Sequence, residues 1–87
     1  MKVLITDPID DAGIERLRGS GHDVETAYDL TGEALRSAVG DANALVVRSG
    51  TEVTEAVFEA ASDLVIVGRA GIGVDNIDID AATDHGV

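Results

Sequence analysis

The 87-residue chain contains no cysteine, no tryptophan and only one proline. The lack of cysteine excludes disulfides and thiolate metal sites, and we assign no metal site to the chain. Because aromatic residues make up only 2% of the sequence, the core must consist of valine, isoleucine, leucine and alanine. No apolar run approaches the ~20 residues of a membrane span, and the N-terminal apolar stretch is too short for a secretory signal. We therefore expect a cytoplasmic protein without a membrane partner.

Basic residues are also scarce, with six Lys and Arg against 17 Asp and Glu and a net charge of -11. Such a charge repels nucleic acids and anionic membrane surfaces, so neither is expected as a partner. The acids are scattered along the chain, as on a solvated surface. We favour adaptation to high salt, because a Debye length of ~3 Å at 1 M salt screens self-repulsion. A cationic partner or bound metal ions are the alternatives.

Apolar runs alternate with segments of helical spacing along the whole chain. Strands are predicted over 2–6, 22–27, 42–47 and 64–67, and helices over 9–18, 32–39, 54–61 and 79–84. Thr31, Thr54 and Asp78 are predicted helix caps. This alternation predicts a single α/β domain: an open parallel sheet with helices on both faces, in three layers. The pattern calls for another strand after Gly86, so we expect a sheet truncated before its fifth strand.

Two of the five arginines stand just past predicted strands. Arg48 follows the run 44–47, and Arg69 follows the run 64–68. Because parallel sheets bind ligands outside the carboxyl ends of their strands, both arginines are expected at one edge, as a site for a small anion. The alternative is that each arginine only pairs with a nearby carboxylate.

Glycines accompany both arginines. In the segment 68–76, the amides of Ile72 and Gly73 are candidates for binding an anion, because glycine lets main-chain N–H groups converge. Ser49 and Gly50 form a second candidate cradle beside Arg48. The segment is not a dinucleotide fingerprint, since the third glycine position holds Asn76 and the next helix begins later. A loop that merely needs positive φ is the alternative.

The stretches 46–54 and 67–78, together with 3–7, 81–83 and 85–87, resemble the D-2-hydroxyacid dehydrogenase family. The resemblance implies a flavodoxin-like substrate-binding domain built from both ends of a longer chain, with a Rossmann nucleotide domain inserted between them. Residues 1–87 would form the N-terminal segment of the substrate-binding domain. The nucleotide-binding domain would be absent from this chain.

The same resemblance implies roles for six residues in substrate binding, namely Arg48, Ser49, Gly50, Arg69, Ile72 and Gly73. The arginine nearest the substrate's phosphate would be Arg69, and Ile72 would also lie near the nicotinamide end of NAD. The family's catalytic residues lie downstream, so none is assigned here. His22 and His85 are expected to be surface or cap residues, and Asp75 a hydrogen-bonding residue of its loop.

The implied activity is the NAD-dependent oxidation of a small anionic 2-hydroxy acid. We expect the substrate to be 3-phospho-D-glycerate, which is oxidised at its 2-hydroxyl in serine synthesis. The isolated chain should be inactive, and the parent enzyme is expected to be a homo-oligomer. Glycerate or hydroxypyruvate chemistry is the alternative within the family. A receiver-like signalling or interaction domain is the alternative from another class, although Arg48 stands where a receiver needs an aspartate.

Overall fold

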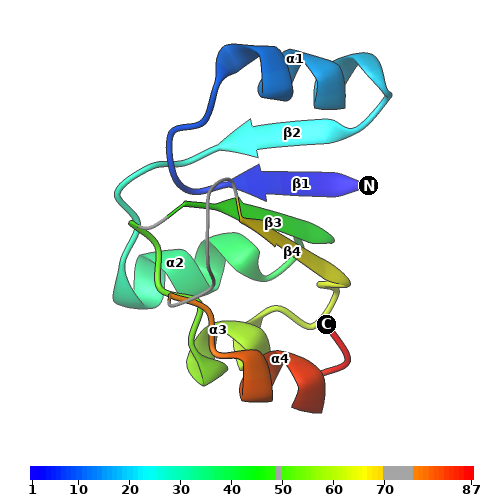
Figure 1. The fold of residues 1–87 in the computed structure, drawn as a ribbon. Helices are drawn as coiled ribbons and strands as arrows, with labels where there is room; N and C mark the ends of the chain where they lie inside the picture. Colours follow the sequence, from blue (N-terminus) through cyan, green and yellow to red (C-terminus); the bar gives the residue numbers. More distant parts are fainter. Residues whose placement is uncertain (49, 70–75) are drawn as a thin grey trace.

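The computed structural model describes residues 1–48, 50–69 and 76–87, and the predicted alternation of strands and helices is confirmed in them (Figure 1). The strands are β1 (Lys2–Ile5), β2 (Asp23–Thr26), β3 (Ala44–Val47) and β4 (Ile66–Arg69). The helices are α1 (Asp11–Gly19), α2 (Gly32–Val39), α3 (Glu55–Ala60) and α4 (Ile79–Asp84). None of the described helices is long and apolar enough to cross a membrane.

The four described strands form one sheet in the order β2-β1-β3-β4, and every neighbouring pair is parallel. The carboxyl ends of the strands therefore share one edge. From β1 the chain moves first to β2 on one side and then to β3 on the other side. The order thus reverses between β1 and β3, and in open α/β sheets such a switch point is where ligands bind.

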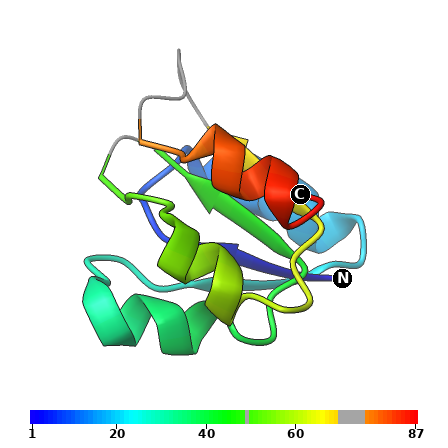
Figure 2. The ribbon, with the colours of Figure 1, turned by 90° about the horizontal axis from the view of Figure 1, so that it is seen from below.

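Helices cover both faces of the sheet, as the three-layer prediction requires. On one face, α1 packs its buried Ile14 against Val3 and Ile5 of β1. On the other face, α2, α3 and α4 enclose a larger core that includes Leu4 of β1 and Phe58 (Figure 2). The alternation of Val3, Leu4 and Ile5 between the two faces follows from the two-residue period of a strand.

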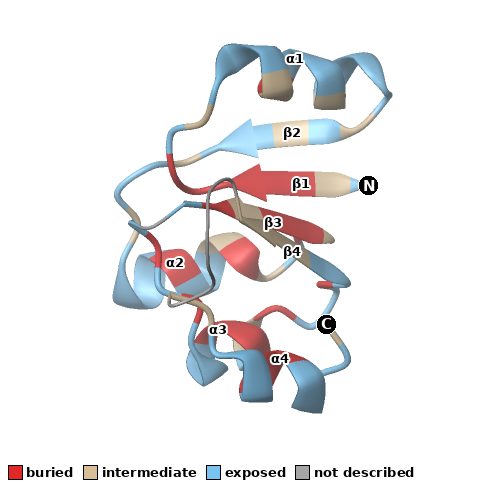
Figure 3. Ribbon diagram, in the orientation of Figure 1, coloured by how far each residue is buried: buried red, intermediate tan, exposed pale blue. Residues whose placement is uncertain are grey.

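The central strands carry most of the burial in the sheet, whereas β2 and α1 are largely exposed (Figure 3). Leu4, Ile5 and Leu45 are completely buried, and the rest of the core is almost entirely aliphatic. Phe58 is the one aromatic residue in the described core. The mostly aliphatic core agrees with the composition, because the sequence contains few aromatic residues.

The helix starts were only partly predicted. Asp78 caps α4 as expected, with its Oδ1 accepting from the amide of Ala81 at 3.0 Å. Asp10 plays the same part for α1, which begins two residues later than the predicted helix 9–18. Thr31 and Thr54 occupy the N-cap positions of α2 and α3, but their side chains make no capping hydrogen bond.

The bounds of β4 differ from the prediction of 64–67. Leu64 is buried, but it lies in the connection before the strand, and β4 begins at Ile66 because Ile66 pairs with Ala44 of β3. The register with β3 continues to Arg69, which pairs with Val47. Arg69 is therefore the last residue of a strand, and the prediction that it stands beyond the strand end was wrong.

Candidate functional site

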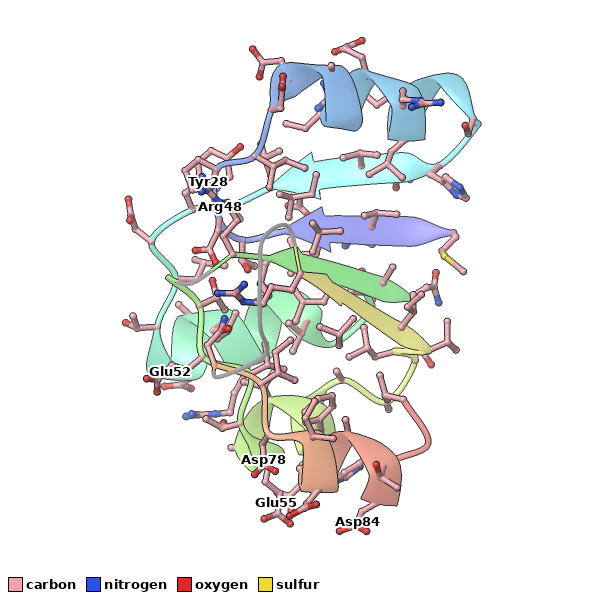
Figure 4. All side chains as sticks on the ribbon, in the orientation of Figure 1. Tyr28, Arg48, Glu52, Glu55, Asp78 and Asp84 are labelled. Atoms are coloured by element: carbon pink, nitrogen blue, oxygen red, sulfur yellow. The ribbon has the colours of Figure 1, made fainter. Side chains whose placement is uncertain are left out.

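The carboxyl edge of β3 and β4 brings the two predicted arginines together. Val47 and Arg69 are register partners, and Arg48 follows Val47 directly. Figure 4 shows Arg48 at the edge toward which the strand arrows point. The prediction that both arginines lie at one edge of the sheet is confirmed.

Asp7, two residues after the end of β1, binds the chain after β3 at Arg48 and Thr51, and we call residues 48–51 the turn. Its Oδ2 accepts hydrogen bonds from the backbone amides of Arg48, at 2.7 Å, and Thr51, at 2.9 Å. Asp7 and Thr51 are both buried, and the Thr51 hydroxyl donates to the Thr6 hydroxyl at 2.9 Å. Hydrogen bonds to a carboxylate are about twice as strong as neutral ones. The turn is therefore firmly tied to the end of β1, at the switch point of the sheet.

Gly50 allows this close approach of carboxylate and turn. A Cβ atom at position 50 would lie 2.7 Å from Oδ1 of Asp7, closer than real Cβ contacts come. The structure thus gives Gly50 a packing reason that is separate from its predicted part in an anion cradle. The amides of Arg48 and Thr51 are already used by Asp7, whereas the guanidinium of Arg48 is exposed and can meet a ligand.

The side chain of Asn76 also contacts this turn. Its Oδ1 accepts from Nε of Arg69 at 2.8 Å, and its Nδ2 donates to the carbonyl oxygens of Arg48 and Thr51. Because Nε–H can only donate, the amide oxygen must face Arg69, which leaves both N–H groups for the two carbonyls. One side chain thus links the end of β4 with the turn after β3.

Arg48 places an exposed guanidinium group at this edge. Arg48 is exposed, its Nη1 donates to the carbonyl oxygen of Pro8 at 3.4 Å, and it makes no ion pair with any described residue. The alternative that Arg48 only neutralises a carboxylate is therefore not supported. Asp7, the buried acid beneath it, is occupied by backbone amides.

The opposite edge of the sheet carries a different polar cluster. Lys2 contacts Asp41 at 2.8 Å and Glu25 at 3.4 Å, and the hydrogen bond with Lys2 lowers the pKa of Asp41 and raises that of Lys2. Asn43 bridges there too, accepting from the backbone amide of Lys2 at 2.8 Å and donating to the carbonyl of Asp63. This cluster is structural and remote from the arginines.

Three candidate residues cannot be placed. Ser49, Ile72 and Gly73 lie outside the described residues, and so does Asp75. The segment does return to the site at Asn76, where the amide of Val53 donates to the carbonyl of Asn76 at 2.8 Å and Val53 and Ile77 form a parallel bridge. The predicted cradle of amides at Ile72 and Gly73 stays a prediction.

A cleft of about 390 Å³ lies beside the turn rather than at the arginines. Gly50, Glu52 and Thr54 line one side of it. The other side comes from the start of α2 and includes Thr31 and Arg36. Its lining mixes apolar and polar residues.

The histidines take the places expected of surface and cap residues. His22 directly precedes β2, and His85 ends α4 with its ring stacked on Phe58, 6.1 Å between centroids. His85 also comes within 4.8 Å of carboxylate oxygens of Glu55 and Glu59. All three side chains are exposed, and this grouping alone does not make a metal site.

Residues 3–87 match the family model described as D-isomer specific 2-hydroxyacid dehydrogenase, catalytic domain. The chain belongs to this family. It is 51% identical over 86 residues to D-3-phosphoglycerate dehydrogenase 2, chloroplastic, of Arabidopsis thaliana, and 51% identical over 87 residues to D-3-phosphoglycerate dehydrogenase of Methanocaldococcus jannaschii. These alignments cover 98% and 100% of the chain but only 14% and 16% of the relatives.

Solved structures agree with this membership. The chain superposes on NAD+-bound 3-phosphoglycerate dehydrogenase of Entamoeba histolytica with a TM-score of 0.89 and 29% identity, over 100% of this chain and 31% of the other. Because the family accounts for nearly all of the chain, the receiver-like alternative has no support. The chain thus spans only a small part of the length of these relatives.

Two residues of the site were missed by the sequence analysis, namely Asp7 and Asn76. Asp7 had a usable signal, since it directly follows a buried strand at the switch point of the sheet. Asn76 was noticed only as the residue that spoils a glycine fingerprint. Its partners are 7, 25 and 28 residues away along the chain, so no local pattern reveals them.

Proposed function

We propose that this chain is the substrate-binding segment of an NAD-dependent oxidoreductase that oxidises 3-phospho-D-glycerate at its 2-hydroxyl, the first step of serine synthesis. The observation that carries the proposal is that Arg48 follows β3 and Arg69 ends the neighbouring strand β4, at the carboxyl ends of the sheet. A substrate with a carboxylate and a phosphate presents two anionic groups, and guanidinium groups suit both. The phosphoglycerate dehydrogenases among the relatives support this choice of substrate.

The chain's part in the reaction is to bind and orient the substrate. The turn of Arg48, Ser49 and Gly50 holds its acidic groups, Arg69 lies beside the phosphate, and the amides of Ile72 and Gly73 receive the carboxylate. Oxidation removes a hydride from C2 and a proton from the 2-hydroxyl, which leaves a 2-keto acid. The proton acceptor belongs to another part of the enzyme.

NAD supplies the hydride acceptor when bound, and the segment described here contributes little to holding it. The turn after β1 is Thr6-Asp7-Pro8, without the glycines that a pyrophosphate cradle needs. We therefore assign NAD binding mainly to a separate Rossmann domain of the same enzyme, with Ile72 beside the nicotinamide. Residues 1–87 then form the N-terminal segment of the substrate-binding domain.

The test measures the rate of NAD reduction by the complete enzyme that carries this segment, with 3-phospho-D-glycerate or D-glycerate as substrate. The rate of hydroxypyruvate reduction is measured in parallel. We expect Arg48→Ala to raise KM for 3-phospho-D-glycerate about tenfold or more, because one charged contact to the substrate is lost. Arg18→Ala is the matched control, since Arg18 is exposed on α1 and pairs only weakly with Glu15 at 3.5 Å.

Preference for D-glycerate or hydroxypyruvate over 3-phospho-D-glycerate would move the assignment to the other enzymes of this family. An unchanged KM in Arg48→Ala would refute the role of that arginine. Dehydrogenase activity of the isolated 87-residue chain would contradict the proposed division of labour, because the chain lacks the assigned catalytic and nucleotide-binding parts.

The same proposal covers the setting of the enzyme: a cytoplasmic homo-oligomer adapted to high salt. The net charge of -11 supports the salt adaptation, because screening relieves repulsion among the carboxylates. We expect the melting temperature to rise steadily with KCl concentration up to molar levels. A melting temperature independent of KCl concentration would count against this adaptation. The molar mass of the complete enzyme from light scattering tests whether it is a homo-oligomer.

A further inference from the structure

We infer that Asn76 is a positioning residue that sets the Arg69 guanidinium relative to the turn of Arg48, and thereby the preference for a substrate with two anionic groups. The inference rests on the proposed function and deepens it. It gives Asn76 no contact with the substrate. Its effect is transmitted through the two arginines.

The Asn76 amide makes three hydrogen bonds to partners on two segments. The single acceptor meets Nε of Arg69 at 2.8 Å, at the end of β4. The two donors meet the carbonyl oxygens of Arg48 and Thr51, the latter at 2.6 Å, in the turn after β3. A hydrogen bond at Nε restrains the direction of the guanidinium group, because Nε is part of its plane.

The main chain at Asn76 is itself held in place. The amide of Val53 donates to the carbonyl of Asn76 at 2.8 Å, and the amide of Asp78 donates to the carbonyl of Val53 at 2.9 Å. Asp78 in turn caps α4. The Asn76 side chain therefore starts from a backbone that is tied to both neighbouring segments, which is what a positioning group requires.

Asp7 completes the arrangement from the other side of the turn. Asp7 accepts from the amides of Arg48 and Thr51, and Asn76 donates to the carbonyls of the same two residues. The turn is thus clamped through all four of these backbone groups. The backbone at Arg48 is therefore held relative to Asn76, which also binds Arg69.

No other common side chain reproduces this pattern. Aspartate at position 76 keeps the acceptor for Arg69 but turns a carboxylate toward two carbonyl oxygens and adds a negative charge beside the substrate's anions. Alanine removes all three hydrogen bonds. These two substitutions separate the loss of the clamp from the addition of a competing charge.

The experiment compares Asn76→Ala and Asn76→Asp with Asn43→Ala in the complete enzyme. Asn43 is the matched control, because it is also an asparagine that bridges backbone groups of two segments, but at the opposite edge of the sheet. We expect Asn76→Ala to raise KM for 3-phospho-D-glycerate about tenfold at unchanged kcat, and to lower the ratio of kcat/KM for 3-phospho-D-glycerate to that for D-glycerate about fivefold. Asn76→Asp should raise KM further, and Asn43→Ala should lower the melting temperature without changing the ratio.

A second measurement on the 87-residue chain checks the clamp without activity. The Nε–H of Arg69 should exchange slowly with solvent in the wild type and in Asn43→Ala, and rapidly in Asn76→Ala, by NMR. An unchanged selectivity ratio in an active Asn76→Ala enzyme, or unchanged Nε–H exchange, would overturn this inference alone. A wild-type enzyme that does not oxidise 3-phospho-D-glycerate would overturn the proposed function instead.

Discussion

Replacing Gly50 with alanine tests the close contact between the turn 48–51 and Asp7. The new Cβ would lie 2.7 Å from Oδ1 and 3.4 Å from Cγ of Asp7. To restore an ordinary contact the carboxylate must move by about 0.7 Å, which stretches the bonds from the amides of Arg48 and Thr51 beyond good hydrogen-bond length. The Asp7 side chain cannot simply swing away, because both amides need it.

The expected cost follows from those two bonds. Hydrogen bonds to a charged group contribute about 1.5–3 kcal/mol each, and partial loss of both gives a destabilisation of roughly 2–4 kcal/mol. In a domain of this size each kcal/mol corresponds to a shift of about 4–8 °C, so the melting temperature should fall by roughly 10–25 °C. Thermal unfolding followed by circular dichroism measures this fall.

Gly19→Ala is the control for Gly50→Ala. Gly19 ends α1, and a Cβ there meets nothing within 4 Å. Alanine is the better helix former, so the control should unfold at the same temperature as the wild type or slightly higher. If Gly50→Ala were as stable as Gly19→Ala, the contact between the turn and Asp7 would not constrain the fold. The conclusion that Asp7 clamps the turn would then be wrong.

Substitutions at three further positions probe the same fold. Asp7→Asn should destabilise about half as much as Asp7→Ala in urea unfolding, since the acceptor stays while the charge is lost; equal losses would contradict a role for the charge. The pKa of Asp41 is lowered from 3.8 by Lys2, so its contribution to stability is present above 3.8 and is lost as the pH falls through the lower folded value. In Asp41→Asn, the free energy of unfolding should therefore fall less steeply at acid pH than in the wild type. Added salt should reduce this difference between the variant and the wild type. Phe58→Ala should cost about 3–5 kcal/mol by calorimetry, because Phe58 fills the larger core; a smaller loss would mean that the core refills.

The fold was predictable from sequence because its elements are defined locally. The buried run 44–47 and the amphipathic spacing of α2 carry enough information to give strand and helix without tertiary contacts. The parallel arrangement then follows from their alternation. That β2 is an outer strand of the sheet was not predicted. Its burial is consistent with that position, because three of its residues are exposed and one is half-buried.

The details of the site depend on pairing that no local pattern encodes. The end of β4 was misplaced because strand bounds follow the register with β3, which put Ile66 opposite Ala44. Asp7 meets the turn across 41 and 44 residues of sequence. The positions of Arg48 and Arg69 after apolar runs could be recognised in the sequence, but the contacts of Asp7 and Asn76 that hold their segments together could not.

The two outer strands of the described sheet differ in a way that matters for any encounter between copies of this chain. At β2, Asp23 and Glu25 are exposed, whereas at β4 the exposed side chain is Ile66. Carboxylates make the first border mutually repulsive, and the second border is attractive to another apolar strand. For copies of the isolated chain, we therefore expect strand addition at β4 rather than at β2.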